Sequence, residues 1–496
     1  MTNYEKYKDT LKRIADVSFT SAVLGWDQET YMPEGSAETR AQQLSTLAGI
    51  SHTMATDKQL EKLLSELSKD STLDDAQRAN VKQTQKDFKR AKKYSVEFVE
   101  EMSRTVSESF SAWQTAKAKN DFKLFAPKLK KLIELKRKEC ELLGYKQHPY
   151  DALLDLHEPG LKTKDVEKLF DGVRKKLVPF VKKIASKKEH SADLLHLNYP
   201  KDKQWDFSIH LLKQMGFDFN IGRQDLSVHP FTTSFSAIDV RVTTRVDEHN
   251  LSDCVTGTIH EGGHALYEQG LPISDYGLPS SEAVSLGIHE SQSRLWENNV
   301  GRSLVFWQGQ FQELQKHFPE QLNGKTAKDV FSALNVVKPS LIRINADELT
   351  YHFHIMIRFE VERAIFSNEL EVEDIPAFWN RKYKEYLGID VPSDAQGCMQ
   401  DVHWSHGSFG YFPTYSLGSF YAAQFFEHAK KHIPDLDQQI EDGNFSELLK
   451  WLRQNIHQYG KRYQAAELCE IVTGEKLNFS YFMDYAKEKY GTLYNL

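Results

Sequence analysis

Long runs of helical periodicity constrain the fold of this chain more than any other feature of its sequence. Apolar residues recur every three or four positions, with few breakers, over residues 6–23, 75–117, 126–143 and 164–186. Short turn-rich breaks occur near residues 26–36, 144–160, 270–280 and 388–404, and none has the length or composition of a flexible linker. With 496 residues, 40% of them hydrophobic, the chain has enough apolar material for a large core. We therefore predict an all-α fold in which residues 1–496 form a single domain, either undivided or with two lobes beside a cleft.

One short segment departs from the helical pattern. In residues 237–244, Ile238, Val240 and Val242 alternate with polar residues, which is the period of a half-buried strand. A strand here would offer a free backbone edge to an extended peptide. We therefore expect a small β element beside the helix that follows it.

Charge and cysteine content exclude several classes of protein. Lys and Arg number 63 against 70 Asp and Glu, and the formal charge of -7 provides no field that attracts nucleic acid or anionic lipid. Four scattered cysteines are typical of a reducing compartment, not of a disulfide framework. No apolar signal segment or membrane-spanning run is visible. These features predict a cytoplasmic protein that binds neither nucleic acid nor membrane.

The strongest candidate site is the segment His260-Glu261-Gly262-Gly263-His264, within a helix predicted over residues 252–269. Because His260 and His264 are four residues apart, their imidazoles project from one helix face, one turn apart. Neutral imidazole binds zinc well, and Glu261 is placed to act on a water at the metal without being a ligand. The pattern predicts metal-assisted hydrolysis with Glu261 as general base. The alternative is a chance match in a long helical protein.

Gly262 and Gly263 favour a functional site. Two glycines in a helix interior cost roughly 1 kcal/mol each relative to alanine, which an ordinary helix face rarely accepts. We expect them to leave room for another backbone or for a substrate.

A third metal ligand has to come from elsewhere. Glu268 lies about 12 Å along the helix axis from His260, too far to share its metal. A second helix, predicted over residues 281–300, offers Glu290 and Glu297 on nearly the same face. Spacing leaves both open, and either is alternatively a salt-bridge partner of Arg294.

Several further motifs occur in order along the chain. They are Trp26-Asp-Gln-Glu-Thr-Tyr-Met-Pro33, His229-Pro-Phe231, Asp239-Val-Arg-Val-Thr243, His289-Glu-Ser-Gln292, Ile342-Arg-Ile-Asn-Ala-Asp347 and Gly397-Cys-Met-Gln-Asp-Val-His-Trp404. Together with the His260 motif they resemble the carboxypeptidase Taq family, the thermostable metallocarboxypeptidases of bacteria and archaea. The resemblance runs over nearly the whole chain and holds at every fixed motif position.

The resemblance implies a mostly helical fold with a deep central cleft, similar to neurolysin and angiotensin-converting enzyme, the gluzincin type. It implies a homodimer with one zinc ion per subunit, or cobalt in its place, and selects Glu290 as the third ligand. It also implies release of single residues from the free C-termini of peptides, with broad preference and poor action at proline.

A carboxypeptidase has to bind a terminal carboxylate, which an arginine does best. Arg343, Asp347 and Tyr351 are spaced as if on one helix face. Arg343 is the candidate for binding the terminal carboxylate, and the alternative is that it forms a salt bridge with Asp347. Arg241 is the second cation, and its motif resembles a barrier to longer chains. The remaining candidates for substrate binding lie in the family motifs and are His229, Gln400, Asp401 and His403.

A glycine- and tyrosine-rich segment follows His403. There Tyr411 or Tyr415 is a candidate donor to the oxyanion, and His403 and His406 are alternatives. We predict a zinc-dependent carboxypeptidase. Two other hypotheses are an endopeptidase or oligopeptidase on the same site, and a non-catalytic peptide-binding protein with a structural metal. Glu261 argues against the latter, because a structural site needs no base.

Overall fold

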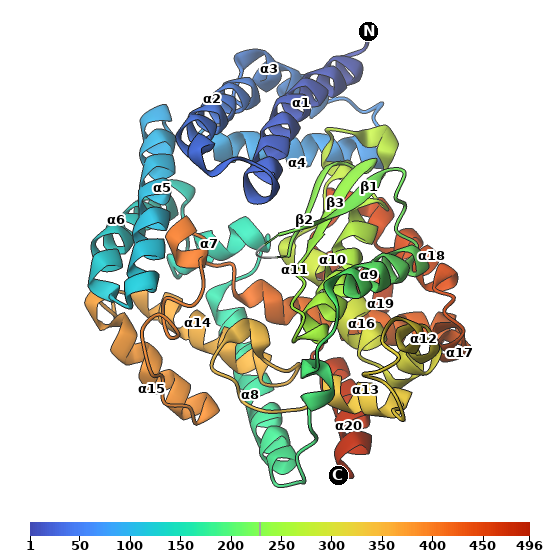
Figure 1. Ribbon diagram of the computed structural model, residues 1–496. Coiled ribbons are helices and arrows are strands. Elements are labelled where there is room, and N and C mark those ends of the chain that lie inside the picture. The colour runs from blue at the N-terminus through green and yellow to red at the C-terminus, as the bar shows by residue number, and fades with distance from the viewer. Residues whose placement is uncertain (228–229) are drawn as a thin grey trace. The chain divides into compact units, whose positions relative to one another are not determined.

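The protein is mostly helical, as predicted, and a computed structural model describes residues 1–227 and 230–496 (Figure 1). The chain divides into two compact units, each built from three separate segments. The first unit comprises Met1–Lys92, His190–Leu334 and Gly418–Asn478. The second comprises Lys93–Glu189, Asn335–Leu417 and Phe479–Leu496. In the part of the chain that is described, no helix is both long and apolar enough to span a bilayer.

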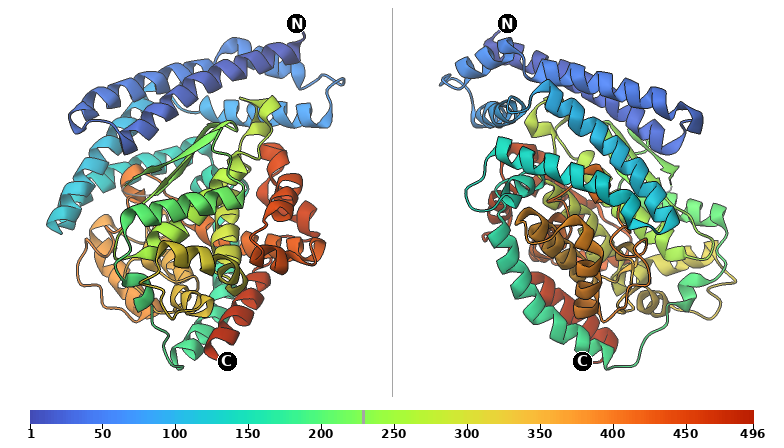
Figure 2. Two further views of the ribbon diagram at one scale, coloured as in Figure 1. Left: turned by 45° about the vertical axis from the view of Figure 1, so that its right-hand side comes forward. Right: turned by 90° about the vertical axis from the view of Figure 1, so that its left-hand side faces the viewer.

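The first unit contains the candidate metal motif. Its helices are α1 (Asn3–Thr30), α2 (Ala37–Ala55), α3 (Lys58–Leu67), α4 (Asp75–Ala91), α9 (Lys201–Met215), α10 (Leu251–Glu268), α11 (Leu286–Arg294), α12 (Leu304–His317), α13 (Ala327–Leu334), α17 (Leu436–Glu441), α18 (Ser446–Asn455), α19 (Ala465–Thr473) and the part of α16 (Pro413–His432) from Gly418 onward. The long helices α1 and α2 lie side by side (Figure 2).

The second unit contains the motifs that follow residue 341. Its helices are α5 (Val96–Lys119), α6 (Phe122–Leu143), α7 (Tyr150–His157), α8 (Thr163–Ala185), α14 (Tyr351–Phe366), α15 (Ile375–Leu387), the first residues of α16, and α20 (Ser480–Tyr494). In α6, buried Phe125, Leu129 and Leu132 recur at helical spacing, so the predicted apolar stripe is the face that packs into the core.

One of the four predicted helical runs is interrupted. Residues 75–117 form α4 and α5, with a break after Ala91. The Ser95 side chain accepts a hydrogen bond from the backbone N–H of Phe98 at 3.2 Å and thereby starts α5. The apolar period alone predicted one continuous helix, but the Ser95 cap starts a new helix there.

The described residues include one three-stranded sheet, with strands β1 (Gly222–Leu226), β2 (Thr232–Ser236) and β3 (Asp239–Thr244) in the order β1-β3-β2. The predicted strand is confirmed as β3, with Val240 and Val242 buried, although Ile238 precedes it and is 50% exposed. The expectation that this strand has a free edge is wrong. β3 is central, paired parallel with β1 and antiparallel with β2, so the edges belong to β1 and β2.

Helix α10 packs against both β2 and β3, and against α9 and α11 (Figure 1). The sheet therefore covers one side of the helix that carries the candidate metal motif, and α11 approaches it from another direction.

Candidate active site

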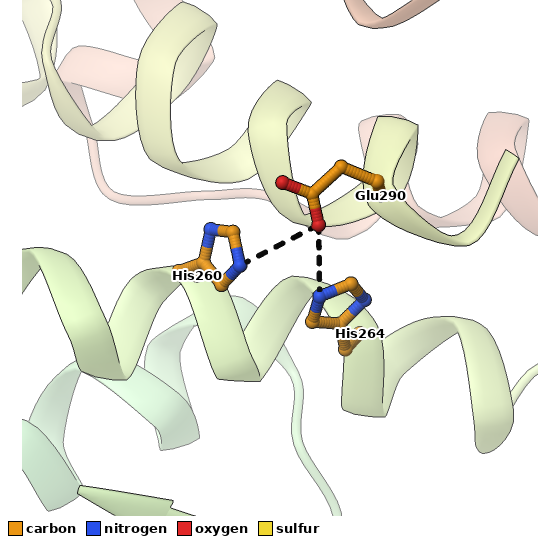
Figure 3. A group of neighbouring side chains, drawn as sticks. All are labelled: His260, His264 and Glu290. Carbon is orange, nitrogen blue, oxygen red and sulfur yellow. Dashed lines mark ion pairs between the residues drawn. The ribbon is translucent and has the colours of Figure 1, made fainter. Parts of the chain in front are cut away.

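Three side chains of the first unit converge on one point. The ligand atoms of His260, His264 and Glu290 all lie within 4.8 Å of one another. Glu290 Oε2 is 3.7 Å from His260 Nε2 and 3.4 Å from His264 Nε2, and Figure 3 shows the carboxylate facing both imidazoles. Donors about 2 Å from a tetrahedrally bound zinc ion are about 3.3 Å apart, so this cluster has the size and donor types of a metal site.

The helices that hold the cluster differ in detail from the prediction. α10 begins at Leu251 with Asn250 as its N-cap residue, one residue earlier than expected. The run predicted over residues 281–300 is instead α11, capped by Ser285, followed by a π-helical segment, η5 (Leu295–Gly301). Its wider turn still leaves Glu290 and Glu297 facing α10, as their contacts with His260 demonstrate.

Close packing of α10 on α11 explains Gly263. A Cβ atom at this position would lie 2.7 Å from Gln292 O and 2.7 Å from Ser293 Cα, both backbone atoms of α11. The expectation that a glycine admits another backbone is therefore confirmed at Gly263. The absence of a side chain there lets Glu290 reach the two histidines.

The Nδ1 atoms of both histidines are engaged, which leaves their Nε2 atoms directed at the cluster. His264 Nδ1 lies 2.5 Å from His289 Nδ1, and His289 Nε2 lies 2.7 Å from Glu268 Oε1. With Nε2 as the ligand atom, His264 donates through Nδ1–H to His289, which in turn donates to Glu268. Such outer contacts fix the tautomer and orientation of a ligand imidazole.

His260 contacts a second carboxylate, that of Glu297, through its other ring nitrogen. His260 Nδ1 lies 2.9 Å from Glu297 Oε2, on the opposite side of the ring from Glu290. Arg294 Nη1 and Arg302 Nη2 donate to Glu297 at 3.1 and 3.2 Å. Arg294 Nε also donates to the other oxygen of Glu290 at 2.7 Å, so the salt bridge and the cluster contact coexist on Glu290.

Glu261 is buried and points at the sheet. The Thr232 hydroxyl, at the start of β2, lies 2.7 Å from Glu261 Oε2 and 2.9 Å from the backbone oxygen of Glu261. Two residues along the strand, the Ser234 hydroxyl donates to Glu268 Oε2 at 2.7 Å. β2 therefore orients both the candidate base and the last member of the His264 chain.

Burial and neighbouring charges set the protonation of the three groups of the cluster. Burial would raise the pKa of Glu290, but Arg294 and His260 outweigh it and hold that pKa well below its ordinary value. Burial lowers the pKa of His264 to about 3, which keeps this imidazole neutral. Burial opposes charge on His260, yet Glu290 and Glu297 raise its pKa. Glu290 and His264 are thus in the forms that bind a metal, ionised carboxylate and neutral imidazole, whereas His260 has to give up the proton that the two carboxylates favour.

In the second unit, Arg343 contacts Asp401 and Tyr351, so the alternative in which it pairs with Asp347 is wrong. Its Nε and Nη2 donate to Asp401 Oδ1 at 3.0 and 2.9 Å, and its Nη1 donates to the Tyr351 hydroxyl at 2.9 Å. The fully buried Arg358 donates to the other oxygen of Asp401 at 2.6 Å. Two guanidinium groups thus share one carboxylate and leave a net positive charge.

The expected helix through Arg343, Asp347 and Tyr351 is also wrong. Arg343–Asn345 is a short 3-10 turn, and α14 starts only at Tyr351. Asp347 accepts hydrogen bonds from the backbone N–H groups of Leu349 and Thr350 at 2.9 and 3.0 Å. These local bonds compete with helical ones and delay the helix.

The glycine- and tyrosine-rich segment gathers three of the predicted catalytic candidates. His403 Nε2 lies 3.1 Å from the Tyr415 hydroxyl, and the rings of Tyr411 and Tyr415 are 5.2 Å apart. Burial lowers the pKa of His403 to about 3, assisted by Arg343 and opposed by Asp401, so the imidazole is neutral.

A buried carboxyl anchors this segment. Glu362 on α14 accepts hydrogen bonds from the Tyr150 hydroxyl at 2.6 Å and from Trp404 Nε1 and the backbone N–H of Gly410 at 2.8 Å each. Burial raises the pKa of Glu362 to about 7, against the effect of these three donors. Glu362 thus ties α14 to the loop that separates His403 from Tyr411.

Comparison with known proteins decides the family. The family model described as "Carboxypeptidase Taq (M32) metallopeptidase" matches residues 6–490. The chain belongs to the carboxypeptidase Taq family. Among curated relatives, it is 41% identical to "Carboxypeptidase 1" of Bacillus subtilis, covering 99% of both chains. It is 39% identical to "Thermostable carboxypeptidase 1" of Pyrococcus furiosus, covering 97% of this chain and 96% of that one.

Solved structures agree with this membership. The M32 carboxypeptidase from Deinococcus radiodurans R1 superimposes with a TM-score of 0.97 at 39% identity, with 100% of both chains covered. As a member of the carboxypeptidase Taq family, the protein is a metallocarboxypeptidase, a hydrolase of peptide bonds that requires a divalent metal ion. The predicted enzyme class is therefore confirmed.

The predicted site residues are distributed over both units. The first unit brings together His260, Glu261, His264 and Glu290. The second brings together Arg343, Gln400, Asp401, His403, Tyr411 and Tyr415, with Asp347 at the start of α14. His229 lies outside the described residues. Sequence reasoning missed the orienting roles of His289, Glu268, Glu297 and Thr232. The one available signal was the position of His289 beside Glu290 in a family motif.

Arg241 is already engaged within the first unit. It forms a two-point pair with Asp239, at 2.9 and 3.1 Å, and its guanidinium carbon lies 4.5 Å from the ring centre of Trp26 and 4.8 Å from that of Phe235. With its charge paired and its plane against two rings, Arg241 connects α1 to the sheet.

Proposed function

We propose that the enzyme is a zinc-dependent carboxypeptidase in which His260, His264 and Glu290 hold one metal ion per subunit, with cobalt as an alternative ion. The observation that carries the proposal is the convergence of these three ligand groups within 4.8 Å, beside a buried glutamate on the same helix. Two imidazoles and one carboxylate leave a coordination position for water or substrate, as catalytic zinc sites do.

Glu261 acts as general base and then as general acid. The metal, when bound, polarises the scissile carbonyl and acidifies the attacking water. Glu261 accepts a proton from that water on a carboxylate oxygen and delivers it to the nitrogen of the leaving amino acid. The Thr232 hydroxyl, 2.7 Å from Glu261 Oε2, holds the carboxylate in place during both transfers.

Recognition of the free C-terminus is assigned to Arg343. The net positive charge of the Arg343, Arg358 and Asp401 group supports this assignment, because a substrate carboxylate would balance it. Gln400 accepts from the backbone N–H of Arg343 at 2.9 Å and positions it. Asp347 and His229 complete the proposed substrate-binding set on the strength of the family motifs alone.

The oxyanion donor is assigned to Tyr415, with Tyr411 and His403 as alternatives. His403 Nε2 lies 3.1 Å from the Tyr415 hydroxyl and positions it. In the neutral tautomer that carries its proton on Nε2, His403 donates to the phenol oxygen, and the phenol in turn donates to the developing negative charge. Arg241 is assigned the role of a fixed wall of the substrate groove, since its own charge is paired with Asp239.

Further properties rest on the family resemblance. They are a single catalytic domain with a deep cleft of the gluzincin type, a homodimer, and broad preference with poor action at proline. The proposal that the protein binds neither nucleic acid nor membrane rests instead on its formal charge of -7 and its hydropathy. A cytoplasmic location is supported by four buried free cysteines, which suit a reducing compartment.

One digest tests the proposal. A peptide is offered with a free and with an amidated C-terminus, with and without chelator, and products are identified by mass spectrometry. Single residues should appear from the free form only, and only without chelator. Internal cleavage of both forms would establish the endopeptidase or oligopeptidase instead.

A further inference from the structure

Strand β2 starts at the candidate base and runs away from it. Thr232, its first residue, contacts Glu261, and Ser234 contacts Glu268, seven residues further along α10. In the order β1-β3-β2, the strand has β3 on one side only. Its other edge is therefore directed away from the sheet.

The backbone pattern identifies which groups lie on that outer edge. The N–H of Thr243 donates to the oxygen of Phe231 at 2.9 Å, and Thr233 stands opposite Arg241 in the same register. Because antiparallel partners alternate between bonded and non-bonded pairs, the N–H and C=O groups of Thr232 and Ser234 point outward. These two residues are the ones whose side chains hold Glu261 and Glu268.

The direction of β2 relates the sense in which a substrate pairs with it to the end of the strand at which upstream substrate residues lie. A carboxypeptidase substrate has its scissile bond at the metal and the rest of its chain upstream. Since β2 runs from Glu261 toward Ser236, a peptide that pairs antiparallel with its outer edge has its upstream residues toward Ser236. Four residues of strand span about 14 Å.

A cavity of about 640 Å³ lies at the far end of β2. Its apolar lining includes Phe19 and Val23 of α1, Ile238 between β2 and β3, and Ile273 beyond α10. Ile238 and Ile273 are 50% and 58% exposed, which is high for isoleucine. Asp16 and Asp239 also line it, the former bound to the Tyr276 hydroxyl at 2.9 Å and the latter paired with Arg241.

We propose that this cavity is an upstream subsite of the peptidase, which takes an apolar side chain of the substrate four or five residues before the scissile bond. The proposal rests on the proposed function of the His260 cluster and on the polarity of β2. Isoleucine and phenylalanine side chains bury an incoming apolar group, and the two aspartates disfavour an acidic one. The preference of the enzyme thus extends beyond the residue that it releases.

A register scan tests the proposal. In a series of free-ended peptides with one C-terminal sequence, a single leucine is moved upstream one position at a time through an alanine background. Each kcat/KM is divided by that of a tripeptide with the same ending, which is too short to reach the cavity. The ratio should rise about tenfold at a single position four or five residues before the scissile bond. Glutamate there should lower it.

Variants locate the effect. In Ile238→Asp and in Ile273→Asp the leucine advantage should disappear, while Ile471→Asp, at an equally exposed isoleucine of α19, should retain it. A flat scan, a preference for lysine over leucine, or an advantage that survives both cavity variants overturns the proposal. Failure of the proposed function has a different signature, because the tripeptide itself would then not be hydrolysed by the unmodified enzyme.

Discussion

Replacing Gly263 by alanine should damage the metal site without touching a ligand. The added Cβ would lie 2.7 Å from two backbone atoms of α11, Gln292 O and Ser293 Cα. Backbone cannot rotate away as a side chain does, so α10 and α11 have to separate by about 0.7 Å to restore ordinary contact. That movement carries Glu290 away from His260 and His264.

The magnitude follows from the tolerance of metal coordination. Ligand distances vary by about 0.2 Å in well-formed sites, less than the required shift. We expect zinc affinity to fall about 10- to 100-fold, the scale seen when the support of a ligand is lost. Overpacking costs about 1–3 kcal/mol, partly offset by about 1 kcal/mol of better helix propensity.

Gly262→Ala is the matched control. Its Cβ would meet only side-chain ends, Leu212 Cδ2 at 2.8 Å and Met215 Cε at 3.0 Å, which can move aside. Competition for zinc against chelators of graded strength measures the affinity of both variants, and thermal unfolding reports their stability. If Gly262→Ala and Gly263→Ala bind zinc equally well, the close approach of α11 is not what positions Glu290, and the reasoning fails.

Four further changes separate the proposed roles. Glu261→Gln should abolish turnover while metal analysis finds full occupancy, because an amide cannot accept the proton; a residual rate within about tenfold would contradict the role of base. Glu290→Ala should strip the metal, whereas Glu297→Ala should only weaken its binding about 10- to 100-fold, and equal losses by metal analysis would make the ligand assignment wrong. Arg343→Ala should lower kcat/KM on free-ended peptides about ten- to a hundredfold, while amidated peptides stay uncut by both enzymes, and product analysis of both peptide forms measures this. Glu362→Gln removes a carboxyl whose pKa rises from 4.5 to about 7 on folding. The folded protein keeps this proton up to a higher pH than the unfolded chain does. The free energy of unfolding of the wild type, relative to that of the variant, should therefore be greatest below pH 4.5 and fall by about 3 kcal/mol as the pH rises to 7. Denaturant midpoints at a series of pH values measure this, and a constant difference would argue against it.

The parts of the site that follow helical periodicity were predictable from the sequence. His260 and His264 share a face because they are four residues apart on one helix. Glu290 and Glu297 both face α10 because they are seven residues, or about two helical turns, apart. The hydrogen-bonded chain from His264 through His289 to Glu268 was not predictable, because it depends on how α11 is rotated about its axis relative to α10. Gly263 indicates that another backbone comes close, but not which segment supplies it or how that segment is rotated.

The sheet and the Arg343 segment show two other limits. β3 alternates clearly, but β1 and β2 read Gly-Arg-Gln-Asp-Leu and Thr-Thr-Ser-Phe-Ser, with no apolar alternation, so the partners of β3 were invisible. Polar side chains of these strands contact hydroxyls and carboxylates, as Gln224 contacts Ser208 and Thr232 contacts Glu261. At Arg343, helical spacing was misleading because the Asp347 side chain supplies local hydrogen bonds that end the pattern.

The interleaved order of the segments has a consequence for biosynthesis. The first unit is completed only by Gly418–Asn478. Gly418 on α16 lies against the Glu290 side chain so closely that any Cβ there would overlap it. A chain emerging from the ribosome therefore displays both histidines of α10 long before the segment that backs their carboxylate partner is made. Domains usually fold as units during synthesis, so this enzyme should acquire high-affinity metal, and with it peptidase activity, only late in translation.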